Sequence, residues 1–205
     1  MSVKLKSKTH NSELASEVDG RTKRGERSRQ LIIDAMLALI DEGNLIPTAQ
    51  QVADRAGVAI RTVFRHFSEM EKLFAEMDSY LQPTFRSLFA GGDRGGSLQE
   101  RVLHAVECHA HGYTKIAPVV RSTLSQIWRW PVLKTNYDRN QQSLRRDLDD
   151  WLPELAKVSQ ETREVIDTIT SFEFWDRLQS RPGINLKTGI TLISQLVLDQ
   201  LYTKP

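Results

Sequence analysis

Four polar side chains in one short segment have the types and spacing needed to read a nucleic acid. Arg61, Thr62, Arg65 and His66 lie within six residues and are interleaved with apolar side chains. Residues four apart share a face of an α-helix, so the two arginines would lie together. A guanidinium can bridge O6 and N7 of guanine, the commonest specific base contact. The segment predicts an exposed helix that enters the DNA major groove, with Arg61 reading a base and Arg65 serving base or phosphate.

Each of these side chains also has a plain structural alternative. The arginines could form a solvated face or pair with Asp54 or Glu69. His66 could donate to a phosphate or pack against the preceding helix. The hydroxyls of Thr48 and Thr62 could contact phosphate oxygens, and Thr48 could also cap a helix, two roles that are compatible.

Two short helices, over residues 48–56 and 60–67, would present these side chains. Gly57 between them can take a positive φ and end the first helix without a Cβ penalty. Thr48 and Gln51 form a capping box at its start. Helices this short need packing from neighbours, so we expect a helix-turn-helix supported by further helices.

The rest of the chain shows helical periodicity and few strand signals, which predicts an all-α protein. A glycine-rich break at residues 90–96 is expected to form a flexible loop. Capping boxes are predicted at Ser68 with Glu71 and at Ser97 with Glu100. The further helices are expected near residues 25–42, from 68, from 97, and over 118–129, 132–151, 159–180 and 185–202.

The composition is that of a globular protein with a basic leading segment. The 205 residues are 40% hydrophobic and carry a net charge of +2. Residues 1–30 hold eight Lys or Arg and four Asp or Glu, a net charge of +4, and the other 175 residues have a net charge of −2. One cysteine excludes an internal disulfide. No leader or long apolar run is present, so we expect a cytoplasmic protein with no membrane contact.

Residues 24–74 resemble the TetR family of transcriptional regulators. The similarity rests on Ala56-Gly57-Val58, Thr62, His66-Phe67 and Leu73, and residues 172–178 resemble part of the family's regulatory domain. The resemblance implies a homodimer that binds double-stranded DNA and an unknown small hydrophobic or aromatic ligand. It divides the chain into a disordered basic arm (1–20), a helix-turn-helix DNA-binding domain (21–70) and a helical ligand-binding and dimerisation domain (71–205).

Three positions depart from the family's usual pattern. The frequent Tyr, Ser and Lys are replaced by Phe64, Ala59 and Met70. These changes remove a phenolic hydroxyl, a helix cap and one phosphate contact. Lys72, or Lys23, Arg24 and Arg27 in the basic leading segment, could compensate.

Aromatic side chains between residues 98 and 180 are candidates for the ligand pocket, and ordinary core packing is their alternative. The candidates are Trp128, Trp130, Trp151, Trp175 and Tyr113, and Phe172, Phe174 and Tyr137 lie in the same stretch. His104, Cys108 and His111 lie on one helical stripe and are further pocket candidates. Imidazole and thiolate can bind a transition metal, but a site on one helix needs another ligand, so we predict no metal and no cofactor.

The last two helices are expected to pair with their copies in the homodimer as a four-helix bundle. Ile190, Ile193 and Val197 form an apolar stripe for this purpose. The alternative is that the stripe closes on its own subunit.

These observations favour a ligand-responsive, sequence-specific transcriptional regulator, a repressor acting on a palindromic operator. The first alternative is a non-specific DNA-binding adaptor that uses the basic arm. The second is an enzyme on a helical bundle, which we do not favour because the chain has no recognisable nucleophile, metal-protease or nucleotide motif.

Overall fold

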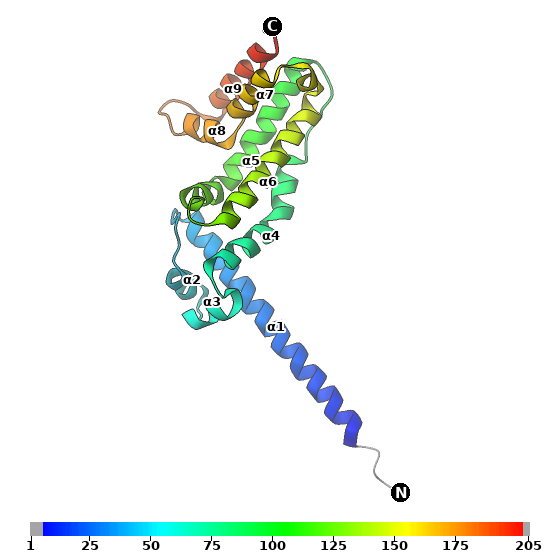
Figure 1. The fold of residues 1–205 in the computed structure, drawn as a ribbon, viewed down its shortest axis with the longest axis vertical. Coiled ribbons are helices and arrows are strands. Elements are labelled where there is room, and N and C mark those ends of the chain that lie inside the picture. The colour runs from blue at the N-terminus through cyan, green and yellow to red at the C-terminus, as the bar shows by residue number, and fades with distance from the viewer. Residues whose placement is uncertain (1–5, 203–205) are drawn as a thin grey trace. The chain divides into compact units, whose positions relative to one another are not determined.

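The computed structural model describes the backbone of residues 6–202 and the side chains of residues 23–202 (Figure 1). The all-α prediction is confirmed: these residues form nine α-helices and one short 3-10 helix, with no strand. Among them, no helix is both long and apolar enough to cross a lipid bilayer. The helices are α1 (Lys6–Asp41), α2 (Ala49–Ala56), α3 (Ile60–Phe67), α4 (Met70–Phe89), α5 (Leu98–Gln126), α6 (Pro131–Trp151), η1 (Pro153–Lys157), α7 (Gln160–Ile169), α8 (Phe172–Gln179) and α9 (Leu186–Tyr202).

The chain divides into two compact units, residues 1–76 and residues 77–205. In the first unit, α2 and α3 pack against the C-terminal half of α1 (Figure 1). The core of this unit is built from almost wholly buried side chains of α1, α2, α3 and the start of α4: Ile32, Met36, Ile40, Val52, Val63, Phe67 and Leu73. This core fixes which side of α3 faces outward.

Helix α1 begins earlier than its apolar periodicity predicts. It starts at Lys6, whereas the first apolar residues that reach the core are Ile32 and Ile33. No proline interrupts the polar stretch, so the helix can continue without an apolar face. The segment predicted as a basic arm is drawn as part of this helix from residue 6 to residue 20, and residues 1–5 lie outside the described part of the chain.

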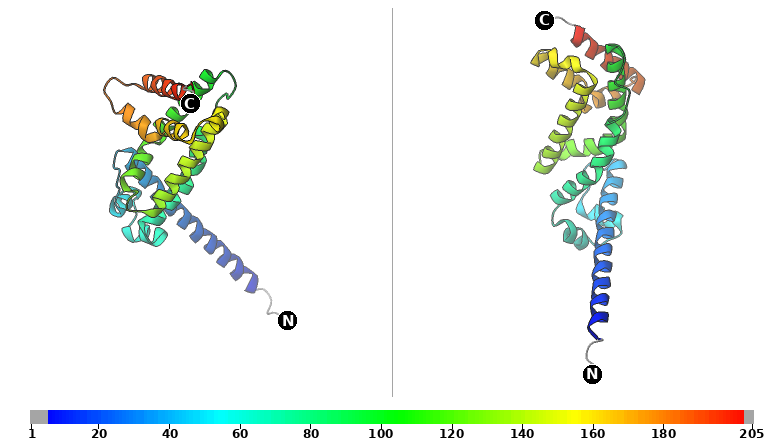
Figure 2. Two further views of the ribbon diagram at one scale, coloured as in Figure 1. Left: turned by 45° about the horizontal axis from the view of Figure 1, so that its top comes forward. Right: turned by 90° about the vertical axis from the view of Figure 1, so that its right-hand side faces the viewer.

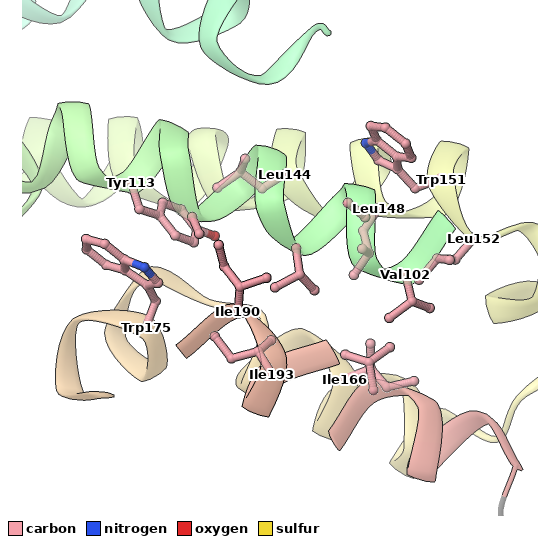
Figure 3. Close-up of a cluster of buried hydrophobic side chains, with 14 of the residues drawn as sticks. Val102, Tyr113, Leu144, Leu148, Trp151, Leu152, Ile166, Trp175, Ile190 and Ile193 are labelled. Atoms are coloured by element: carbon pink, nitrogen blue, oxygen red, sulfur yellow. The ribbon is translucent and has the colours of Figure 1, made fainter. Parts of the chain in front are cut away.

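In the second unit α6, α8 and α9 lie beside α5, and α7 packs against α8 and α9 (Figure 2). Its core gathers side chains from α5, α6, α7, α8 and α9 (Figure 3). Trp151 and Ile166 are fully buried there, and Tyr113 is 2% exposed. The phenol of Tyr113 donates to the Thr170 carbonyl at 2.9 Å, which joins the longest helix of this unit to the junction between α7 and α8.

The apolar stripe of α9 packs within its own chain. Ile190, Ile193 and Val197 are at most 7% exposed and belong to the core around α5. The expectation that this stripe lacks a partner in the same chain is therefore wrong. The exposed apolar side chains of α9 are Leu192 and Leu196, which lie on another side of the helix.

Several predicted boundaries also differ from the structure. Ser68 does not open α4; it ends α3 at φ 48°, with its N–H donating to the Phe64 carbonyl at 2.8 Å. Pro118 lies inside α5, because buried neighbours such as Ala117 hold the helix on both sides of it. The helix expected over residues 159–180 is two helices, since Ser171 accepts from the Phe174 N–H and starts α8.

The glycine-rich segment between α4 and α5 is attached to the core. Gly92, at φ +106°, lies so close to the Trp151 ring that a Cβ would come within 2.5 Å of it. Arg94 stacks over the same ring at 4.9 Å. The sequence correctly predicts a break here, but these contacts constrain the loop.

Candidate DNA interface and ligand cleft

Helix α2 is capped at both ends, and its C-terminal cap forms the turn to α3. The Thr48 hydroxyl accepts from the Gln51 N–H at 3.3 Å, and the Gln51 side chain accepts from the Thr48 N–H at 2.9 Å. Gly57 adopts the left-handed conformation at φ 67°, and Val58 donates to the Ala53 carbonyl at 3.0 Å. This is a Schellman ending, which satisfies a carbonyl at the end of α2 and starts the turn.

Helix α3 buries one side and exposes the other. Val63 and Phe67 are 1% exposed, whereas Arg61 and Arg65 are both exposed. Neither arginine has a hydrogen bond or ion pair among residues 23–202, so the alternative pairing with Asp54 or Glu69 does not occur there. Two charged guanidinium groups therefore lie ready on one helix face, as base or phosphate contacts require.

The start of α3 carries no side-chain cap. Ala59 occupies the cap position and cannot accept from the first amides of the helix. The Thr62 N–H turns back to the Ala59 carbonyl at 2.7 Å, and its side chain is half-buried. The helix start thus offers backbone N–H groups with a favourable dipole for an anion such as phosphate.

His66 lies closer to the packing alternative than to the phosphate role. A Cβ added to Gly25 of α1 would lie 4.0 Å from Cε1 of His66, so the ring lies close to that helix. Nε2 of His66 is buried and has no hydrogen-bond partner in the described residues. Burial lowers the pKa of His66, and the positive charges of Arg65 and Arg29 lower it further. The imidazole is therefore neutral at pH 7.

Other basic side chains in the first unit are exposed. Lys72 lies in the first turn of α4, and Lys23 and Arg24 lie on α1. Arg55 pairs with Glu42 through both of its terminal nitrogens. Thr48 is exposed at the start of α2, but its hydroxyl is already engaged in the capping box.

The second unit contains a cleft of about 490 Å³ between α5, α6, α7 and α8. Two of the aromatic residues predicted to line a pocket, Tyr113 and Tyr137, lie in its wall. Trp175, 4% exposed, lines a smaller space that shares Tyr113 with the cleft. The wall also contains charged residues that the sequence does not single out, namely Arg145, Glu164, Asp167 and Glu173.

The other tryptophans lie elsewhere. Trp128 is 82% exposed, and Trp130 is half-buried beneath the guanidinium of Arg129, 4.9 Å from its ring. Trp151 is fully buried in the core. The sequence does not reveal the charged and polar cleft residues, because a carboxylate on an amphipathic helix has the same pattern whether it lines a cleft or faces solvent.

His104, Cys108 and His111 do not form a joint site. His104 Nδ1 lies 3.2 Å from the Asp93 carbonyl, and His111 Nδ1 lies 2.7 Å from the Glu107 carbonyl. Burial raises the pKa of the Cys108 thiol, which keeps it protonated. Within residues 23–202, no group of three His, Cys, Asp or Glu side chains could hold a metal ion.

The buried histidine of α5 is instead His109, whose Nε2 lies 2.9 Å from Asp147 Oδ2. Asp147 also accepts from Arg94 at 2.6 Å. Burial raises the pKa of Asp147, but the hydrogen bond from His109 and the charge of Arg94 outweigh it and leave the pKa lowered. A signal existed in the sequence: Asp147 lies three residues after Leu144, so a carboxylate shares the apolar stripe of α6.

Comparison with known proteins agrees with this architecture. Residues 32–77 match the family model described as bacterial regulatory proteins, tetR family. A transcriptional regulator from Rhodococcus sp. Rha1 superposes with a TM-score of 0.61 at 17% identity, covering 88% of this chain and 99% of that chain. A second, described as a transcriptional regulator from Streptomyces coelicolor A3(2), gives 0.60 at 18% identity, covering 86% and 99%.

At these identities the two solved structures establish the fold. A search of curated protein sequences found no match. The family match covers α2, α3 and the packed parts of α1 and α4, the segment whose caps and exposed arginines were described above. Residues 32–77 thus carry the DNA-binding domain of the TetR family of bacterial regulatory proteins.

Proposed function

We propose that the protein is a homodimeric, sequence-specific repressor whose DNA binding responds to a small molecule. The observation that carries the proposal is the pair Arg61 and Arg65, which are exposed on one face of α3 and unpaired among the described residues. In this proposal Arg61 reads a base, while Arg65 contacts base or phosphate. Lys72, Lys23, Arg24 and the start of α2 at Thr48 contribute phosphate contacts, which position the helix without specifying sequence.

A homodimer would present two copies of α3 to one operator. Helix-turn-helix dimers meet half-sites about 34–36 Å apart, or a multiple of one turn, so the operator should be near-palindromic. We assign the pairing surface to the exposed side of α9, where Leu192 and Leu196 are 41% and 38% exposed. Residues four apart form one apolar patch that a second copy would cover.

The cleft in the second unit is the proposed ligand site. A ligand bound there could change the spacing of the two recognition helices only if it binds one arrangement of the dimer more tightly than the other. Ligand and operator would then compete through one equilibrium. The protein would act in the cytoplasm and needs no catalytic group for this role.

Selection of bound duplexes from a random pool tests the proposal. Sequencing should return a near-palindrome with two equivalent half-sites. Arg61→Ala protein should select a site that is relaxed at one position in each half.

A pool that stays random after selection, with binding that falls steeply with salt, would instead indicate the non-specific adaptor. The basic N-terminal segment favours this second candidate. Replacing Lys23, Arg24 and Arg27 with glutamine separates the two cases, because the net charge of +4 in residues 1–30 comes from residues 21–30. The selected sequence should survive these substitutions, whereas adaptor binding should not.

A further inference from the structure

The 490 Å³ cleft of the second unit has more carboxylates than basic groups in its wall. Glu164, Asp167 and Glu173 contribute three carboxylates, and Arg145 is the one guanidinium in the wall. Arg145 contacts both Glu164, at 3.1 Å, and Asp167. Arg163 also reaches Asp167, at 3.3 Å, but it pairs with Asp149 at 2.9 Å as well.

Glu173 is the carboxylate without a cation. Its Oε1 accepts from the hydroxyl of Tyr137, and no ion pair to it occurs among residues 23–202. Burial raises the pKa of Tyr137, and the bond to Glu173 raises it further, so the phenol stays a neutral donor. A carboxylate attracts a cation by its charge, and a neighbouring aromatic ring attracts the same cation through its quadrupole.

A smaller space that adjoins the cleft supplies an independent sign of a ligand. It has room for about one water molecule, and it shares His109, Tyr113 and Thr170 with the cleft wall. Trp175 lines it, and the indole Nε1 has no hydrogen-bond acceptor in the described residues. This nitrogen lies on the side of the ring that faces Tyr113 and Ile190 (Figure 3). A buried donor without a partner favours a ligand that brings an acceptor.

We propose that the cleft binds an organic cation with an aromatic or apolar body, held at Glu173 and Tyr137, with a hydrogen-bond acceptor directed toward Trp175. The inference rests on the proposed function, because it names the effector class of that regulator. The carboxylate of Glu173, which has no ion pair in the described residues, disfavours an anionic effector such as a fatty acid at this position.

Benzoylcholine is a suitable probe, because it carries a quaternary ammonium, an ester carbonyl and a phenyl ring. Its matched control is 3,3-dimethylbutyl benzoate, in which a carbon replaces the nitrogen and the shape is retained. In calorimetric titrations of the full-length protein, benzoylcholine should bind at least roughly tenfold more tightly than the neutral ester. Equal affinities, or no binding of benzoylcholine, would overturn the proposal.

Glu173→Gln removes the charge and keeps an acceptor for Tyr137. It should weaken benzoylcholine roughly fivefold to tenfold and leave the neutral ester unchanged. Asp138→Asn is the matched control, because Asp138 lies on α6 outside the cleft wall and pairs with Lys134 on the surface. If both variants bound the cation like the unmodified protein, the assignment to Glu173 would be wrong.

The titration does not involve DNA, so its outcome is separate from that of the duplex selection. A selected palindrome without cation binding would overturn the effector class alone. Cation binding at Glu173 by a protein that selects no duplex would overturn the regulatory function and retain the site.

Discussion

Replacing Arg61 with alanine is the sharpest test of how α3 meets DNA. The side chain is exposed and has no partner within the described residues, so the folded protein loses no internal contact. The free energy of unfolding should change by less than about 0.5 kcal/mol, as for other surface substitutions. Any loss of DNA binding can therefore be assigned to the complex.

The size of that loss follows from the contact that we assign. A bidentate arginine–guanine contact discriminates against the wrong base by roughly 1–3 kcal/mol. This corresponds to a loss of about fivefold to 150-fold for the selected duplex. A duplex that is already changed at the contacted base pair should be bound almost equally by the variant and the unmodified protein.

Fluorescence anisotropy at several salt concentrations measures both quantities. A base contact leaves the slope of log K against log salt unchanged, whereas loss of a phosphate contact makes it shallower by about one. Arg55→Ala is a matched control, because it removes the same charge from an exposed arginine that pairs with Glu42. A uniform loss across all duplexes with a shallower slope would refute base reading by Arg61.

The remaining predictions concern stability and assembly. Gly57→Ala should destabilise the protein by roughly 1–2 kcal/mol, measured by denaturant titration, because φ is +67° and the space around it is open, so the cost is conformational. Thr48→Ala removes a helix cap and should lower stability by about 1 kcal/mol and weaken all duplexes alike in anisotropy assays; a sequence-selective loss would contradict this. Asp147→Asn should lower the melting temperature at pH 7. Because the folded pKa of Asp147 is lowered, the carboxylate contributes stability above its unfolded value of 3.8, and this contribution is lost as the pH falls through the folded pKa, so the difference in melting temperature should narrow in acid. Leu196→Asp should give a monomer in analytical ultracentrifugation with its helical circular dichroism unchanged, and a dimer that survives would move the interface elsewhere.

The first unit could be predicted closely because its signals are local. Thr48 with Gln51 and the glycine at 57 are read directly from neighbouring residues, and the structure ends α2 and begins α3 at the expected positions. The prediction that Ser68 opens α4 is wrong. A serine three residues before a glutamate suits a capping box, but here its backbone takes the positive φ that ends the preceding helix.

The second unit was less predictable because its features depend on residues far apart in sequence. Pro118 suggested a helix boundary, yet packing on both sides keeps α5 continuous. The cleft combines Tyr137 of α6 with Glu173 of α8, and no periodicity within either helix reveals that they meet. Aromatic content suggested a pocket, but Trp151 is buried core and Trp128 lies on the surface.

The bond between Tyr113 and Thr170 bears on how sensitive the regulator can be. This phenol lines the cleft and also satisfies a carbonyl at the junction of α7 and α8. An effector that displaces Tyr113 must break a buried hydrogen bond, at a cost of about 1–3 kcal/mol. That cost raises the concentration needed for half-occupancy by roughly fivefold to 150-fold. In the proposed function, the hydroxyl of Tyr113 would thus raise the effector concentration at which the repressor leaves DNA, and lower concentrations would have no effect.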